Sequence, residues 1–125
     1  MGKQKRVADG QLEAAVMEVL WHRGGWVTPG EVHDVLAAQR PLAYNTVLTI
    51  LVRLCRKGRV DRQRDGRAHA YHPVHSREEH AAALMERVLH HATDRPAALA
   101  SFVETLGAAD RAQLRRLLDQ LRRKG

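Results

Sequence analysis

The chain has 125 residues, of which 44% are hydrophobic, and a formal net charge of +7. This length suits one globular domain or a small domain with an appendage, and no apolar run is long enough to span a bilayer. The N-terminal sequence MGKQKRVADGQ lacks the apolar segment of a signal peptide, so we expect a cytoplasmic protein without membrane contact. The single cysteine, Cys55, excludes an intramolecular disulfide and any CxxC metal or redox site.

Most of the positive charge lies in one segment, residues 40–67. It contains eight basic and two acidic residues, which gives it +6 of the total charge. A concentrated basic segment is typical of a protein that binds a polyanion, and nucleic acid is the commonest polyanion in the cytoplasm. An arginine-rich solvated surface is the other explanation of this pattern.

The first predicted helix covers residues 10–23. Residues 1–8 are polar and basic without periodicity, and we expect a mobile tail there. Apolar residues then recur at helical spacing from Leu12 onward, and Gly24-Gly25 ends the helix. Trp26-Val27 is a short extended piece that we consider a candidate third strand for the sheet described below.

A strong helix-start signal follows directly. Thr28 is a good N-cap, Pro29 suits the first helical position, and Glu31 completes a capping box. We expect this second helix to run to about Gln39. A turn at residues 40–42 then joins it to a third helix, which is the arrangement of a helix-turn-helix.

The third predicted helix, residues 43–57, has one apolar face and one polar, basic face. The apolar side chains recur at i, i+3, i+4 and i+7 and are Val47, Ile50, Leu51 and Leu54. The opposite face has no Asp or Glu, and its Asn, Thr and Arg side chains can reach base edges in a DNA major groove. An amphipathic helix with a solvated outer face is the alternative. The residues that we expect to face the groove are Asn45, Thr46, Thr49 and Arg53.

After the third helix the sequence changes to a twofold period. Two extended segments, 59–64 and 67–73, flank Asp65-Gly66, which is a strong hairpin signal. A two-stranded ribbon that directly follows a helix-turn-helix is a wing. It would be marginal alone, so we expect it to pack on the three helices. The residues that we expect at phosphates or in the neighbouring minor groove are Tyr44, Arg56, Arg62, Arg64, Arg67 and His69.

Residues 76–125 are predicted to form three more helices. Ser76 and Glu79 form a capping box, Asp94 caps the second helix, and Gly107 separates it from the third. These helices hold about 50 residues and one aromatic side chain, too little for a core of their own. We therefore expect a second copy of the chain to cover them, and packing onto the N-terminal domain is the alternative. The expected dimerisation residues are Leu84, Met85, Val88, Leu99, Phe102, Val103, Leu114, Leu117, Leu118 and Leu121.

Eight histidines raise the question of a metal site. His69, His72 and His75 are three residues apart on an extended segment, where this spacing alternates between faces, so they do not converge on one ion. The dipole at a helix C-terminus explains His90-His91 more simply. The chain has no phosphate-binding loop, nucleophile elbow or catalytic Cys/His arrangement. The sequence predicts no metal ligands, no cofactor and no enzymatic activity.

Several stretches resemble the BlaI/MecI family of bacterial repressors. They are LEAAVMEVLW (12–21), YNTVLTILVRL (44–54), RKG (56–58), RAHAY (67–71) and FVE (102–104). The combination is more specific than the winged-helix order alone, and the match covers nearly the whole chain. The resemblance implies a homodimeric winged-helix repressor that binds palindromic operators and governs β-lactam-resistance or related genes.

The family also has a known route of induction. In its better-known members, a membrane metalloprotease sensor triggers cleavage in the dimerisation region, just before the Phe of the FVE stretch. The bond that corresponds here is Ser101-Phe102, with Ser where staphylococcal-type members have Asn. The resemblance therefore implies a sensor protease as a partner. Copper-responsive relatives carry CxC pairs near the C-terminus, and this chain has none.

The sequence as a whole predicts a mainly α fold with a small β-wing. We expect a winged helix-turn-helix domain in residues 1–75 and a C-terminal three-helix dimerisation region in residues 76–125. The predicted function is a sequence-specific transcriptional repressor that binds double-stranded DNA at the nucleoid as a homodimer. A winged-helix protein-interaction module and a metal-responsive regulator that uses the histidines are the alternatives.

Overall fold

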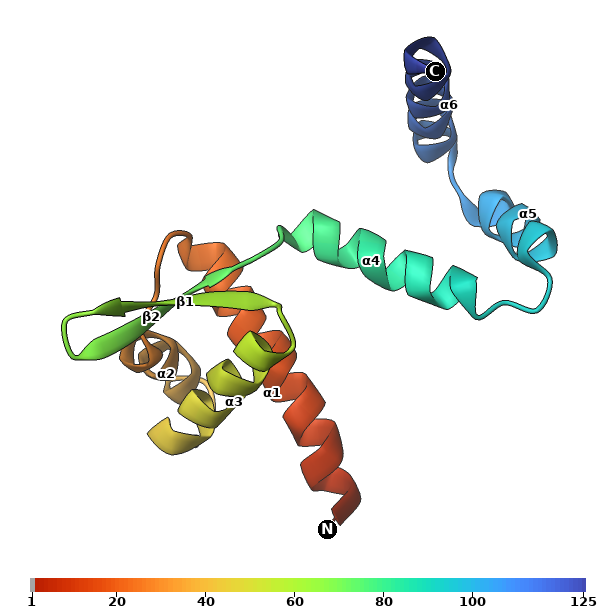
Figure 1. Cartoon of the computed structure of the whole chain (residues 1–125). Coiled ribbons are helices and arrows are strands. Elements are labelled where there is room, and N and C mark those ends of the chain that lie inside the picture. Colours follow the sequence, from red (N-terminus) through yellow and green to blue (C-terminus); the bar gives the residue numbers. More distant parts are fainter. Residues whose placement is uncertain (1) are drawn as a thin grey trace. The chain divides into compact units, whose positions relative to one another are not determined.

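The computed structural model describes residues 2–125, and the side chains of residues 2–9 and of Asp65 lie outside this description. The chain divides into two compact units, Met1–His80 and Ala81–Gly125. Figure 1 shows helices throughout and one two-stranded antiparallel sheet in the first unit. No helix among the described residues is both long and apolar enough to cross a bilayer.

The elements occur in the predicted order. The first unit contains α1 (Gly2–Arg23), α2 (Pro29–Ala37), α3 (Tyr44–Arg56), β1 (Val60–Asp65) and β2 (Ala68–Pro73). The start of α4 (Arg77–His90) also belongs to the first unit, and the second unit continues with α5 (Arg95–Thr105) and α6 (Ala108–Lys124). This arrangement confirms the prediction of a mainly α fold with a small β-wing.

Helix α1 is longer than predicted. It begins at Gly2, eight residues before the expected start at residue 10, so the expected mobile tail is wrong for residues 2–8; residue 1 lies outside the described part. No proline interrupts this stretch, and its Lys, Gln, Arg and Ala residues have good helix propensity. A helix can therefore begin in a stretch without apolar periodicity, which is why the predicted start at residue 10 was too late.

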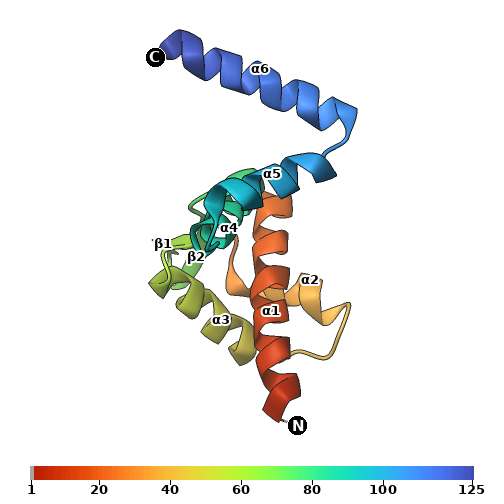
Figure 2. The same cartoon turned by 90° about the vertical axis from the view of Figure 1, so that its right-hand side faces the viewer.

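The core of the first unit lies between the three helices and the hairpin. Helix α1 packs against both α2 and α3, and Figure 2 shows the three helices side by side. The four side chains predicted for the inner stripe of α3 are at most 2% exposed. The core residues are Leu12, Val16, Met17, Val19, Leu20, Val27, Val32, Leu36, Val47, Ile50, Leu51, Leu54, Val60 and Tyr71. This closed core fixes which face of α3 is turned outward.

The predicted capping box at the start of α2 is present. The Thr28 hydroxyl accepts a hydrogen bond from the Glu31 N–H at 3.2 Å, and the Glu31 carboxylate accepts one from the Thr28 N–H at 3.0 Å. The hydrogen bonds from Thr28, its backbone first, lower the pKa of Glu31, and the charge of Arg23 acts in the same direction. Helix α2 ends at Ala37, two residues before the predicted end.

The hairpin packs on the helices as predicted, and its turn is shifted by one residue. Val27 exchanges two backbone hydrogen bonds with Tyr71, at 2.9 and 2.8 Å, so the candidate third strand pairs with the hairpin as one isolated bridge and does not form a strand. Asp65 pairs with Ala68, which leaves Gly66-Arg67 as the two-residue turn instead of Asp65-Gly66. Gly66 has φ +65°. Glycine with positive φ at the first central position is typical of a type II′ turn, which matches the strand twist.

The first turn of α4 is fastened to α1. The predicted capping box is present, since Ser76 and Glu79 exchange hydrogen bonds of 2.8 and 3.0 Å. The Trp21 indole N–H donates to the His75 carbonyl at 2.9 Å. The Arg77 guanidinium donates to the Glu18 carboxylate at 2.6 Å and also lies 5.6 Å from the centre of the Trp21 ring. These contacts explain why the first unit extends to His80.

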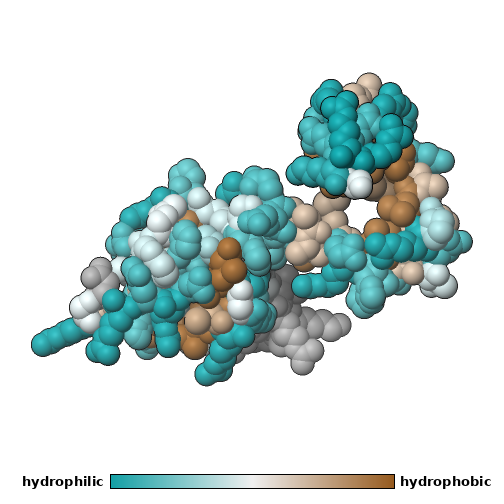
Figure 3. All heavy atoms as spheres, turned by 45° about the horizontal axis from the view of Figure 1, so that its top comes forward, coloured by the Kyte–Doolittle hydropathy of each residue, from teal (hydrophilic) through white to brown (hydrophobic). Residues whose placement is uncertain are grey.

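The second unit buries none of its side chains. Helices α4, α5 and α6 contain no buried residue, and nine of their large apolar side chains are between 40% and 74% exposed. Figure 3 shows hydrophobic residues at the surface of this unit, on the right of the view. A groove of about 650 Å³ between α4 and α5 is lined by Leu84, Met85, Val88, Leu99 and Phe102, among others. By itself this unit leaves its apolar stripes facing solvent.

Candidate nucleic-acid interface

The outer face of α3 carries the residues predicted to read DNA. Asn45 and Thr49 are exposed, and Thr46 and Arg53 are half-buried at the edges of the same face. They lie opposite the buried stripe because successive residues turn by about 100° around the helix axis. The structure therefore brings these four side chains together on the outside of the second helix of the helix-turn-helix.

One of these side chains already has a local hydrogen bond. The Thr49 hydroxyl donates to the Asn45 carbonyl one turn earlier, at 2.9 Å. This uses the only hydrogen of the hydroxyl group. The lone pairs of the hydroxyl oxygen can still accept a hydrogen bond from a base amine, and the γ-methyl group can contact a thymine methyl group. Thr49 is thus better suited to apolar contacts or to accepting a hydrogen bond than to donating one.

A carboxylate from α1 lies beside this outer face of α3, here called the reading face. The sequence did not predict its position. The Glu13 carboxylate accepts from the Lys57 ammonium group at 2.9 Å and lies 3.9 Å from an Arg53 guanidinium nitrogen. The side chain of Glu13 is 13% exposed, whereas that of Arg53 is 41% exposed. Glu13 therefore pairs mainly with Lys57 and leaves most of the Arg53 guanidinium open to a ligand.

The start of α3 is electropositive and has no side-chain cap. Ala43 is the N-cap residue, and no acidic residue occupies the first turn. The unpaired N–H groups of a helix start attract anions, and an acidic cap would repel a phosphate there. Tyr44, predicted to contact phosphate, is 45% exposed at this end.

Three of the four predicted wing residues share one face of the hairpin. The register pairs Arg62 with Tyr71 and Arg64 with His69, and directly paired residues point to the same side of a sheet. Tyr71 is buried in the core, so this is the face turned toward the helices. Toward the tip, the Arg64 guanidinium donates to the Gly66 carbonyl at 3.2 Å. The fourth residue, Arg67, lies in the turn itself.

The basic side chains of this surface are available to a polyanion. Among the described residues, Arg56 and the three wing arginines (Arg62, Arg64 and Arg67) form no ion pair within 4.0 Å. All four are exposed. Arginine binds phosphate through paired N–H groups, so unpaired guanidinium groups are suited to a phosphate backbone.

The histidines raised the possibility of a metal centre. Among the side chains that the structure describes, in residues 10–64 and 66–125, no group of three His, Cys, Asp or Glu is placed to hold a metal ion. A ring nitrogen of His72 lies 3.0 Å from the Gly25 carbonyl, and its ring lies 5.3 Å from the Trp26 ring at a tilt of 39°. His69 lies on the opposite face of the strand from His72, because the two are three positions apart and side chains alternate between faces.

A compact three-helix core, a short turn between α2 and α3, and a packed hairpin with exposed arginines define a winged helix-turn-helix. Its outer α3 face and its wing together form a basic surface with polar groups for base contacts. The fold and this surface identify a DNA-binding domain.

Comparison with known proteins places the chain in a family. A family model described as penicillinase repressor matches residues 9–120. The chain therefore belongs to the penicillinase repressor family, the BlaI/MecI family that its sequence motifs indicated. It is 48% identical to the transcriptional regulator BlaI of Mycobacterium tuberculosis (strain CDC 1551 / Oshkosh) over 124 residues, 97% of this chain and 88% of the relative. The same protein in strain H37Rv gives the same values. The solution structure of the DNA binding domain of the repressor BlaI is similar with a TM-score of 0.49 and 28% identity, covering 55% of this chain and 83% of that one.

The family assignment confirms the predicted class of function. The protein is a DNA-binding transcriptional repressor, and its family consists of repressors and not of enzymes. The individual DNA contacts, the dimer and the inducing signal remain predictions.

Proposed function

We propose that this repressor binds a palindromic operator as a homodimer and controls β-lactam-resistance or related genes, working at the nucleoid in the cytoplasm. The observation that carries the proposal is that the two units of the chain have different surfaces. The first unit offers a basic, polar face on a closed core, and the second unit has helices whose apolar stripes are left exposed by the unit's own residues. One unit is suited to DNA and the other to a second copy.

The DNA contacts in this proposal fall into two sets. On the outer face of α3, the side chains that read base edges in the major groove are Asn45, Thr46, Thr49 and Arg53. The residues that bind phosphates or the adjacent minor groove are Tyr44, Arg56, Arg62, Arg64, Arg67 and His69. Among the described residues, the guanidinium groups of the second set are exposed and form no ion pair, which supports their assignment to the phosphate backbone.

Residues 76–125 form the dimerisation region in this proposal, after a winged-helix domain in residues 1–75. The groove between α4 and α5 is lined almost entirely by apolar side chains. A second copy would fill it with an identical stripe, as a twofold interface requires. The residues that would be buried are Leu84, Met85, Val88, Leu99, Phe102, Val103, Leu114, Leu117, Leu118 and Leu121.

Repression then depends on the two copies being linked. Two α3 helices held in one dimer would bind half-sites about one helical turn apart. Linking makes the second binding event intramolecular, whereas a monomer on one half-site has few phosphate contacts and low affinity. Any event that separates the copies would release the operator.

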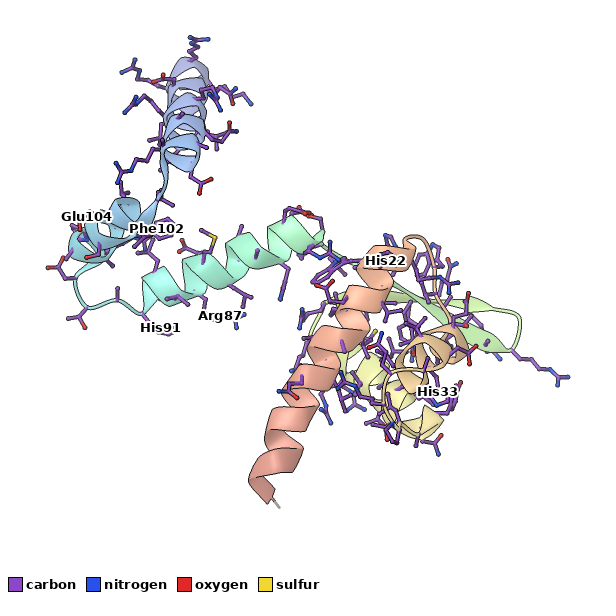
Figure 4. All side chains as sticks on the ribbon, turned by 180° about the vertical axis from the view of Figure 1, so that it is seen from behind. His22, His33, Arg87, His91, Phe102 and Glu104 are labelled. Carbon is purple, nitrogen blue, oxygen red and sulfur yellow. The ribbon has the colours of Figure 1, made fainter. Side chains whose placement is uncertain are left out.

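Cleavage by a sensor protease is a candidate for that event. Ser101 and Phe102 are exposed within α5, and Figure 4 labels Phe102 on this helix. Cleavage of the bond between them would divide α5 and detach the apolar stripe of α6 from that of α4. Because proteases bind extended segments, α5 would have to unwind locally at Ser101-Phe102 before cleavage.

Selection of binding sites from a random duplex library tests the proposal. Full-length protein at about physiological salt is expected to enrich an inverted repeat whose half-site centres lie about one turn apart. The genes downstream of such repeats would then identify the regulated functions. Enrichment of nothing beyond bulk DNA would contradict the proposal of a sequence-specific operator.

A further inference from the structure

We propose that His33 is a positioning residue that holds the turn of the helix-turn-helix and aims Tyr44 at the DNA backbone. The inference rests on the proposed function, because it concerns the phosphate contact assigned to Tyr44. His33 lies on α2 and is labelled in Figure 4. It belongs to neither set of predicted DNA contacts and to no metal site.

The first observation is a hydrogen bond across the turn. The Nε2 atom of His33 lies 2.7 Å from the Leu42 carbonyl oxygen, nine residues later in the chain. A carbonyl oxygen only accepts, so Nε2 must carry the hydrogen and donate it. The bond therefore ties the middle of α2 to the residue just before the N-cap of α3.

The second observation is a ring contact with Tyr44, the first residue of α3. The two ring centres are 6.0 Å apart and the planes meet at 77°. This edge-on arrangement is favourable because the electropositive edge of one ring meets the electronegative face of the other. His33 is half-buried, whereas Tyr44 is 45% exposed, so the inner ring supports the outer one.

The start of α3 needs such support because it lacks a cap of its own. The starts of α2 and α5 are held by side-chain bonds from Thr28 and Asp94, whereas Ala43 offers no side-chain acceptor. An acidic cap on α3 would repel the phosphate that the helix start is placed to bind. His33 binds the carbonyl side of the turn, so it fixes the turn without occupying an N–H group of α3.

Three variants of His33 separate the bond from the ring contact. His33→Gln keeps an amide donor the same number of bonds from the backbone and loses the aromatic ring. His33→Phe keeps a ring and loses the donor, and His33→Ala loses both. Gln39→Ala is the matched control, because Gln39 is an exposed neutral residue just beyond α2.

The measurement is the affinity of each full-length variant for the selected operator at one salt concentration. His33→Ala is expected to weaken binding about five- to tenfold, the size of effect that one hydrogen bond and one ring contact give. His33→Gln is expected to recover part of the loss, and Gln39→Ala to bind like the wild type. A merely structural role would lower the unfolding temperature without this pattern of affinities.

A double-mutant cycle with Tyr44 gives the decisive comparison. If His33 acts through Tyr44, His33→Ala will cost much less affinity in a Tyr44→Ala background than in the wild type. Equal losses in both backgrounds, or wild-type affinity of His33→Ala, would overturn the inference. If the wild type prefers the operator and Tyr44→Ala binds it with wild-type affinity, the inference about His33 would also be overturned. A wild-type protein without operator preference would refute the proposed function itself and this inference with it.

Discussion

Replacement of Arg53 by alanine is expected to relax the sequence preference of the repressor while leaving its fold intact. Arg53 lies on the outer face of α3 with 41% of its side chain exposed, and its contact with Glu13 is long, at 3.9 Å. An exposed ion pair of this kind contributes between zero and about 1 kcal/mol. Lys57 continues to pair with Glu13 at 2.9 Å, so the carboxylate keeps a partner in the variant.

The loss on the DNA side is expected to be larger. An arginine that binds a base edge contributes about 1–3 kcal/mol of discrimination. At about 1.4 kcal/mol for each factor of ten, this corresponds to an affinity loss of about 5- to 150-fold for each half-site of the operator. Binding of operators with the contacted base pair changed should fall much less, because the wild type cannot make this contact there.

Fluorescence anisotropy with the selected operator and single-base-pair variants of it measures this difference. The Arg53→Ala protein should bind the operator and one of the variants with nearly equal affinity, and circular dichroism should show an unchanged fold. Retention of the full wild-type preference by Arg53→Ala would refute the assignment of this face of α3 to base reading.

Other predictions concern phosphate contacts, the nearby carboxylate, the α2 cap and the division of the chain. Arg64→Ala should weaken binding to all sequences alike and reduce the slope of log K against log salt by about 0.9 for each copy, or about 1.8 for the dimer, as measured by salt titration. Glu13→Gln should strengthen binding to operator and bulk DNA equally in the same titration, because it removes a negative charge beside Arg53 and Lys57. The Thr28 hydrogen bonds lower the pKa of Glu31. The stability that the ionised Glu31 carboxylate contributes is therefore present at neutral pH and is lost as the pH falls through the lowered pKa. In urea unfolding, Glu31→Gln should lose less stability in acid than the wild type. Truncation after His80 should leave a folded monomer with weak DNA binding, and a dimer in sedimentation experiments would contradict the assignment of dimerisation to the second unit.

Features with local causes could be predicted from the sequence. The capping boxes at Thr28 and Ser76 involve residues three apart, and both are present. The inner stripe of α3 follows from helical spacing, which does not depend on the rest of the fold. For the same reason the outer face of α3 was predicted correctly as a surface, although its contacts with DNA await measurement.

Features that depend on distant residues could not be predicted. Glu13 and Arg53 are forty residues apart, and only the packing of α1 on α3 brings the carboxylate to the reading face. The bond from His33 to Leu42 likewise depends on the path of the turn between two helices. Asp65-Gly66 and Gly66-Arg67 both suit a two-residue turn, and strand pairing decides between them.

The mass of the complex between full-length protein and operator tests the central claim most directly. Light scattering on a size-exclusion column can compare the selected inverted repeat with a duplex in which one half-site is scrambled. If the repressor binds as a dimer, two chains should be bound to the intact repeat. On the scrambled duplex we expect a large loss of affinity and no stable single-chain complex. One chain bound equally well to both duplexes would contradict the account.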